Sequence, residues 1–229
     1  MPRRVLTASK ANFGSRLRAR SGFIAAVYAA LAVQIAVTAA MTVYFRKNPA
    51  VYERLRSLWI LWLVLNIAIL LALAFLPLPF AVRALLFVLF AVVLSFTFIA
   101  ADRRVSPETI RAGLTAAVGI FVAMTAVGLG LAAAGVDLSF LTYVLLAALI
   151  GLVVTFIAIR FFPVGKTAMK AILLVAMTIF AVFVAYDTNL LLAPGAPTGA
   201  AAVLDAAIGF YLDIVNLFTE AVAYTGLDE

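Results

Sequence analysis

The chain has 229 residues, of which 67% are apolar, and it carries 17 Lys and Arg against 10 Asp and Glu, for a net charge of +7. Soluble chains are about half apolar and about one quarter charged, so this composition excludes a soluble enzyme, a secreted disulfide scaffold and a disordered chain. The sequence contains neither cysteine nor histidine. Thiolate chemistry and Cys or His metal ligands are therefore excluded, and any response to pH must come from carboxylates.

The first 21 residues are basic and contain no acid. We interpret residues 1–21 as a basic tail at a membrane surface, because the apolar run that follows is too long for the core of a cleavable signal peptide. An organelle transit sequence is the alternative, since the tail is rich in Arg and contains Ser. The Arg residues beside the first apolar segment favour a cytoplasmic amino terminus, although the count of Lys and Arg over all connectors points the other way.

Seven long apolar segments follow, separated by short polar connectors. A helix crosses the hydrocarbon layer in about 20 residues, and continuously apolar segments indicate helices rather than the alternating strands of a barrel. The sequence therefore predicts an all-α membrane protein, with a bundle of seven transmembrane helices in residues 22–225 and a short acidic tail at 226–229. The seven segments are residues 22–45, 58–75, 84–101, 111–134, 139–159, 171–193 and 201–224.

Acids inside the last two segments are the candidate functional residues, because ionisable groups are costly in a spanning helix. Asp187 lies roughly 9 Å from the end of its segment, and Asp213 lies roughly 18 Å into the next segment, at the helical rise of about 1.5 Å per residue. The two helices are expected to be antiparallel across a short connector. Both carboxylates then fall in the same half of the membrane, and we predict that they form a pair.

The last segment also carries a polar stripe. Gly209, Asp213, Asn216 and Glu220 recur on one helical face. Lipid cannot satisfy such a stripe, so we expect this segment to be the central helix of the bundle.

Two carboxylates in a water-poor site cannot both ionise cheaply, so we expect the pair to hold a shared proton near neutral pH. After deprotonation, Asp187 and Asp213 would offer hard oxygen ligands to Ca²⁺. Asn189, Asp205, Asn216 and Glu220 are the candidates for an ion path. The alternative is a structural hydrogen-bonded pair that only holds two helices together. We expect no cofactor other than Ca²⁺ as a permeant or transiently bound ion, and no nucleic-acid partner.

Three stretches resemble signatures of the Bax inhibitor-1 (lifeguard) family. Residues 186–190 (YDTNL) are similar to its "YDTQ-hydrophobic" motif, residues 210–218 (FYLDIVNLF) to its "LYLDIINLF" motif, and residues 114–139 to its "TA…D-(F/L)-S" passage. The resemblance implies six or seven helices around a central one, with Asp187 and Asp213 as a pH-sensing pair that gates a Ca²⁺ leak. It also implies roles in Ca²⁺ homeostasis, in suppression of cell death in eukaryotic members, and in modulation of a membrane protease in bacterial relatives.

The sequence departs from the family pattern in places. Residues 58–75 lack the arginine of some bacterial members, residues 84–101 lack the usual acid, and Glu220 is additional. The implied location is a bacterial inner membrane, or the endoplasmic reticulum or another organelle membrane in a eukaryotic or viral setting.

Three other functions remain open. An intramembrane aspartyl protease needs Gly-x-Gly-Asp at its second aspartate, where this chain has FYLD at 210–213. A proton-coupled transporter usually shows an internal repeat, and we find none. A non-conducting protein that restrains a membrane-protein partner is the third alternative. Because the protease motif is missing, we expect a membrane protein that is not an enzyme.

Overall fold

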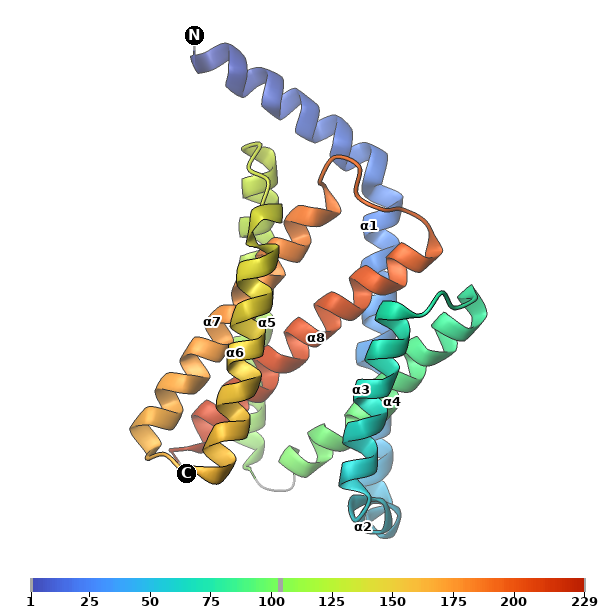
Figure 1. The fold of residues 1–229 in the computed structure, drawn as a ribbon, viewed down its shortest axis with the longest axis vertical. Coiled ribbons are helices and arrows are strands. Elements are labelled where there is room, and N and C mark those ends of the chain that lie inside the picture. The colour runs from blue at the N-terminus through green and yellow to red at the C-terminus, as the bar shows by residue number, and fades with distance from the viewer. Residues whose placement is uncertain (1, 103–104, 229) are drawn as a thin grey trace. The chain divides into compact units, whose positions relative to one another are not determined.

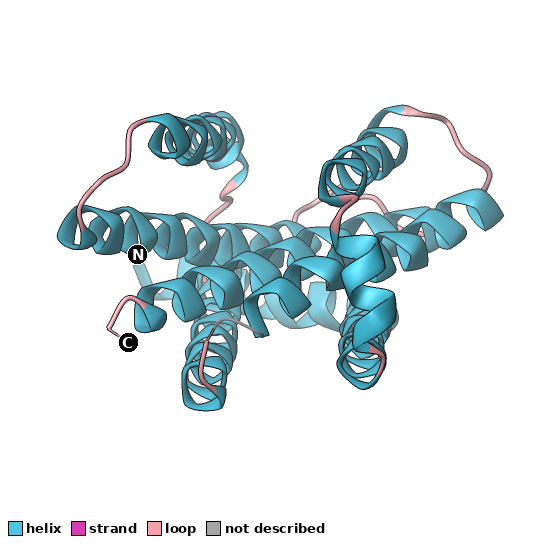
Figure 2. Cartoon of the chain, turned by 90° about the horizontal axis from the view of Figure 1, so that it is seen from below, coloured by secondary structure: helices cyan, strands magenta, loops and turns pink. Residues whose placement is uncertain are grey.

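The computed structural model describes residues 2–102 and 105–228, and within these ranges the chain forms eight α-helices and one 3₁₀ turn (Figure 1). Figure 2 shows helices joined by loops, with no strand in the described ranges. The predicted all-α class is confirmed. The elements are α1 (Pro2–Lys47), α2 (Pro49–Arg56), α3 (Trp59–Phe75), α4 (Phe80–Asp102), α5 (Pro107–Ala133), η1 (Ser139–Leu141), α6 (Thr142–Phe161), α7 (Lys166–Leu191) and α8 (Ala200–Gly226).

The predicted number of seven membrane spans is not confirmed. Among the described residues, five helices are long and apolar enough to cross a membrane. α2 and α3 pass the same test only as a pair bent by 79°, which would make six. α4 is 23 residues long, and its part Phe80–Phe96 is apolar. The physical reason for the shortfall at α3 is length, because 17 residues extend about 26 Å, less than the ~30 Å hydrocarbon layer. The count of seven spans is thus not established.

The helix is not broken at the boundary predicted between the tail and the first span. The predicted tail and the segment at 22–45 form one continuous helix, α1. No proline or glycine-rich turn separates the two regions.

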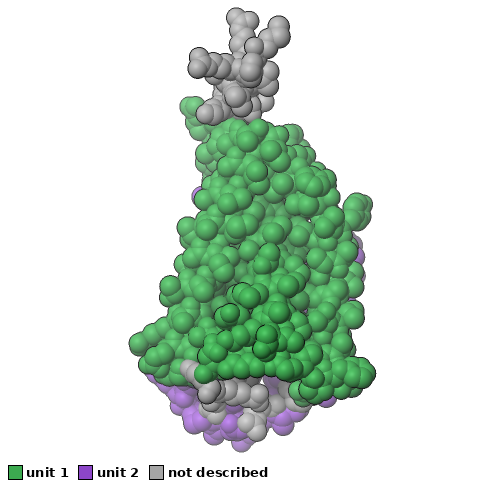
Figure 3. Space-filling view, turned by 90° about the vertical axis from the view of Figure 1, so that its left-hand side faces the viewer, with its two compact units in different colours: residues 1–22, 106–196, 212–229 green, residues 23–105, 197–211 purple. Residues whose placement is uncertain are grey.

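The helices belong to two compact units, coloured separately in Figure 3. Unit 1 consists of residues 1–22, 106–196 and 212–229, and unit 2 of residues 23–105 and 197–211. In unit 1, α5 and α6 pack against α7, and in unit 2, α3 packs against α4. α8 contributes to both units.

Both parts of α8 contain buried residues. Tyr211, in unit 2, is 1% exposed, and Asp213, in unit 1, is 4% exposed. A central position of α8 in the bundle stays a prediction.

The carboxyl end of α5 is fixed by a glycine turn. Gly135 has a φ of 81°, which glycine adopts without steric cost. The N–H of Val136 donates to the carbonyl of Leu131 at 2.9 Å, and that of Gly135 donates to Ala132 at 3.1 Å. This Schellman pattern satisfies carbonyls at the helix end and directs the following connector back toward α7.

Close packing of α5 on α7 depends on Gly128. A methyl group at this position would overlap the carbonyl oxygen of Ala185 and the Cβ atom of Thr188. Small residues allow such close approach where lipid supplies no hydrophobic driving force between helices.

We therefore expect Gly128→Ala to force α5 and α7 apart and to lower the free energy of unfolding by about 1–3 kcal/mol, the usual cost of overpacking. Thermal unfolding of the purified protein in detergent measures this. Gly119→Ala is the matched control, because a methyl group there meets open space. Equal stability of the two variants would show that the α5–α7 contact does not need a glycine.

Candidate functional site

Asp187 and Asp213 lie in unit 1, on α7 and α8 respectively. Asp213 is 4% exposed and Asp187 is partly buried. The charge of Asp187 acts on the carboxyl group of Asp213. A direct pair of the two acids stays a prediction.

One oxygen of this pair lacks a partner. Within the described residues, Oδ2 of Asp213 is buried and accepts no hydrogen bond. A buried polar atom without a partner is costly, and a buried charge is more so. A proton held between the two carboxyl groups would remove the repulsion of like charges and supply the missing donor.

The residues around Asp187 tie the end of α7 to the chain that follows α5. Asn189 is 2% exposed; its Nδ2 donates to the carbonyl of Val136 at 2.9 Å, and its Oδ1 accepts from the N–H of Leu138 at 3.0 Å. The hydroxyl groups of Tyr186 and Thr142 lie 2.7 Å apart. Asn189, predicted beside an ion path, thus has both polar groups bonded to a connector.

The other predicted ion-path residues divide between the units. Asn216 and Glu220 are in unit 1 with Asp213 and are partly buried, and the side chain of Asn216 donates to its own helix at Leu212, at 2.8 Å. Asp205 belongs to unit 2, where it is exposed and ion-paired with Arg83. Asn216 and Glu220 therefore share unit 1 with the two aspartates, whereas Asp205 pairs with Arg83 in unit 2.

The number of acidic ligands bears on whether Ca²⁺ could be held at this site. Among the residues that the structure describes, no three acidic side chains form a group that could hold a metal ion. Ca²⁺ takes about 6–8 oxygen ligands, so Asp187 and Asp213 alone would need many backbone carbonyls or waters to complete a site. Binding of Ca²⁺ by the two aspartates stays a prediction.

Sequence reasoning missed two residues at the carboxyl end of α7. Arg16 donates to the carbonyls of Leu192 and Ala132, and Arg20 donates to those of Leu191 and Ala196. Their spacing of four residues places both on one face of α1. That signal was visible in the sequence, but their acceptors, more than 100 residues away, were not.

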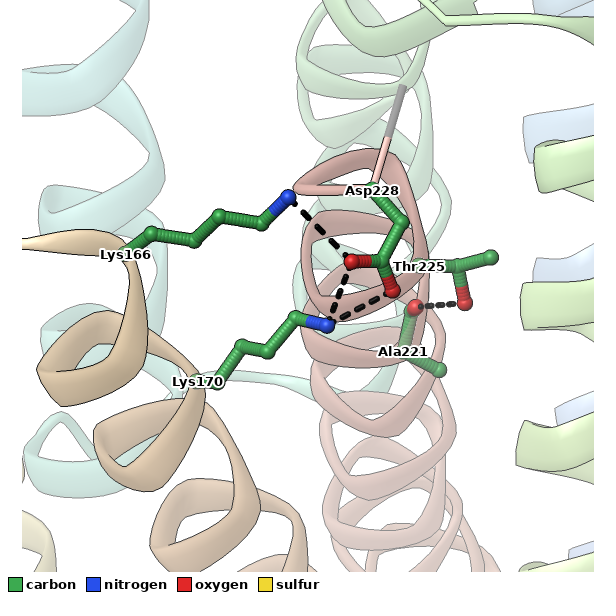
Figure 4. Close-up of polar contacts among 5 residues, drawn as sticks. All are labelled: Lys166, Lys170, Ala221, Thr225 and Asp228. Carbon is green, nitrogen blue, oxygen red and sulfur yellow. Dashed lines mark hydrogen bonds and ion pairs between the residues drawn. The ribbon is translucent and has the colours of Figure 1, made fainter.

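The opposite end of α7 is bound to the end of α8 (Figure 4). Nζ of Lys170 lies 2.6 Å from Oδ2 of Asp228, and Nζ of Lys166 lies 3.2 Å from Oδ1. The Lys170 ammonium is also 5.0 Å from the ring centroid of Tyr224. Asp228 offsets two cations at the positive end of the α7 dipole, where they are otherwise unfavourable.

This architecture defines a multi-pass helical membrane protein that holds two interacting carboxylates inside its apolar helices. Residues 20–226 match the family described as "Inhibitor of apoptosis-promoting Bax1". The chain belongs to this family, the Bax inhibitor-1 family, which confirms the resemblance seen in the motifs.

Two curated relatives are plant proteins from Arabidopsis thaliana. "Protein LIFEGUARD 4" is 30% identical over 205 residues, which cover 87% of this chain and 82% of that protein. "BI1-like protein" is 30% identical over 210 residues, covering 87% and 78% respectively. An uncharacterized protein of Deinococcus radiodurans is 29% identical over 204 residues, or 86% of each chain.

Hydrogen bonds from Lys170 and then Lys166 hold the pKa of Asp228 below its ordinary value. A depressed pKa contributes stability at pH values above the unfolded pKa, and the contribution is lost as the pH falls through the folded pKa. We therefore expect Asp228→Asn to lower the unfolding temperature slightly at about pH 7 and not at all at about pH 2. Thermal unfolding in detergent at the two pH values measures this.

A double-mutant cycle supplies the control for Asp228. In a chain that already carries Lys166→Met and Lys170→Met, the same Asp228→Asn change should have no effect. An effect of equal size with and without the lysines would show that the ion pairs do not carry the interaction.

Proposed function

We propose that this chain is a pH-sensitive cation leak channel of the Bax inhibitor-1 type, permeable to Ca²⁺ and gated by the Asp187–Asp213 pair. The observation that carries the proposal is the buried Oδ2 of Asp213, which lacks a hydrogen-bond partner within the described residues and lies beside a second carboxylate. In a membrane protein, ionisable groups kept inside the helices are associated with ion and proton pathways.

In acid, the pair keeps a proton. The two carboxyl groups then carry at most one negative charge and are joined by a hydrogen bond, which holds α7 and α8 together and closes the path. As the pH rises the proton leaves, and two negative charges in a poorly solvated site repel each other. The helices separate at this point, water enters, and the carboxylates attract Ca²⁺ as the transported ion.

Passage needs binding that is weak enough to be reversed. A pair of carboxylates meets this requirement, because no third acid joins it in a metal-holding group within the described residues. Glu220 lies seven residues beyond Asp213, about two helical turns along the same face, and would take the ion onward. Asn216 lies between them and would contribute its side-chain oxygen. Asn189 and Asp205 remain weaker candidates, because both are bonded elsewhere.

The setting follows from charge and family. With the basic amino-terminal segment in the cytoplasm, the Asp187 end of α7 faces the same side, because Arg16 and Arg20 bind there. The family description, inhibitor of apoptosis-promoting Bax1, supports restraint of cell death where the host has such a pathway. A role in Ca²⁺ homeostasis would follow from the proposed Ca²⁺ leak. The same description also supports modulation of a membrane-protein partner without conduction, which is the second candidate.

Ca²⁺ flux into liposomes containing the purified chain tests the gate. Between about pH 5 and about pH 8, flux through the wild-type protein should rise with pH. Asp213→Asn and Asp187→Asn should each abolish this dependence, because a single carboxylate has no second charge to repel. Asp137→Asn is the matched control: it removes a carboxylate in the connector and keeps the oxygen that accepts from the N–H of Ser139. An unchanged pH profile in both pair variants would refute the gate, and absence of any flux would favour the non-conducting alternative.

Glu220 tests the path separately from the gate. Glu220→Gln should reduce Ca²⁺ conductance several-fold while flux still rises with pH, since it removes a charge beyond the pair but leaves the pair intact. Single-channel or liposome recordings over a range of Ca²⁺ concentrations measure this. Unaltered conductance would assign Glu220 a structural role.

A further inference from the structure

Two arginines of α1 bind four backbone carbonyls at one end of unit 1. Arg16 donates from Nη1 to Leu192 at 3.2 Å and from Nη2 to Ala132 at 3.3 Å. Arg20 donates from Nη1 to Leu191 at 2.9 Å and from Nη2 to Ala196 at 2.7 Å. Each guanidinium therefore joins the carboxyl end of α7 to a second element, α5 for Arg16 and the α7–α8 connector for Arg20.

These contacts supply hydrogen-bond donors to carbonyls at the end of α7. The last four carbonyls of a helix have no partner within the helix, and in apolar surroundings an unpartnered carbonyl is costly. A positive charge is also favourable at this end of the helix dipole. Only arginine offers a planar group whose donors point in fixed directions toward two acceptors at once.

The turn that these arginines hold is the turn that carries Asp187. Leu191 is four residues after Asp187, so in a regular α-helix the N–H of Leu191 bonds to the carbonyl of Asp187. Fraying of the last turn would release Asp187 from the helix. Asn189 binds the connector after α5, so this turn is held by α1 and by that connector.

Among the side chains that the structure describes, contacts place five charged groups at this end of α7. They are Asp187 and Asp213 themselves, Arg16 and Arg20 of α1, and Asp137 of the connector that binds Asn189. α5 and α6 carry their other charged residues, Glu108, Arg111 and Arg160, near their opposite ends.

We propose that Arg16 and Arg20 are positioning residues for the gate: their guanidinium groups clamp the carboxyl end of α7 to α5 and to the α7–α8 connector, and thereby hold Asp187 in register with Asp213. This inference rests on the proposed function. The clamp matters most in the closed state, where a shared proton requires two carboxyl groups at hydrogen-bond distance. Repulsion in the open state requires no such precision.

Three variants of the full chain in liposomes test the clamp. Arg16→Met with Arg20→Met removes it; Arg16→Lys with Arg20→Lys keeps both charges and loses the paired donors. Arg18→Met is the matched control, because Arg18 is exposed and donates to Gly14 of its own helix. Two measurements are made on each: Ca²⁺ flux against pH, and hydrogen–deuterium exchange of the amides in residues 189–196.

The double Met variant should exchange these amides faster and should leak several-fold more Ca²⁺ in acid, so that its flux changes less with pH. The double Lys variant should resemble it, because an ammonium group cannot join two elements in this geometry. Arg18→Met should match the wild type in both measurements. Where the double Met chain does not yield folded protein, Arg20→Lys alone gives the same comparison at one site.

Each other outcome overturns a defined claim. Wild-type behaviour of the double Lys chain would show that charge alone suffices, and unchanged exchange in the double Met chain would show that no clamp exists. Faster exchange with an unaltered pH profile would show that the clamp does not position the gate. A wild-type protein whose flux does not depend on pH would refute the proposed function itself, while the exchange data would still decide whether the arginines hold the helix end.

Discussion

A polar group inside the apolar helices of this protein must find its partner within the protein, because lipid offers none. Most side chains meet this condition locally. Thr188 donates to the carbonyl of Val184 at 2.7 Å, and Asn216 bonds within α8. Asp213 does not: one of its oxygens is buried without a partner in the described part of the chain, and a second acid is its neighbour. In the proposed gate, the free energy of this arrangement depends on a single proton.

α7 is held at both of its ends. Its amino end is bound to Asp228, and its carboxyl-terminal part lies against Gly128 of α5 and is held by arginines and by Asn189. A helix fixed at both ends has little freedom to rotate or slide. Movement at the gate is then more readily assigned to α8, whose residues belong to both units. Packed helices convert small local shifts into changes between discrete arrangements. A small shift at the aspartate pair is of this kind.

The sequence predicts the helical class, the seven apolar segments and the two aspartates, because each follows from a local cost. A long apolar run forms a spanning helix. An acid within such a helix is costly, so its presence indicates a functional residue. Long-range pairing has no local signal. The sequence predicts a surface tail around Arg16, because nothing local indicates its acceptor Leu192, which is 176 residues away. It predicts Asp205 as an ion-path residue, whereas Asp205 pairs with Arg83. The count of seven spans is not confirmed, since α3 is short and α2 is bent against it.

The contacts of α7 also bear on how many times the chain traverses the bilayer. The amino-terminal segment binds one end of α7 through Arg16, and the carboxyl-terminal segment binds the other end through Asp228. If α7 spans the membrane, the amino and carboxyl termini are therefore on opposite faces of it. Termini on opposite faces require an odd number of membrane passes. Five and seven spans satisfy this condition, and six spans do not. The bent α2–α3 pair and α4 therefore either both cross the membrane or both remain at one face of it. Reporter proteins fused to the two termini would accordingly experience different compartments.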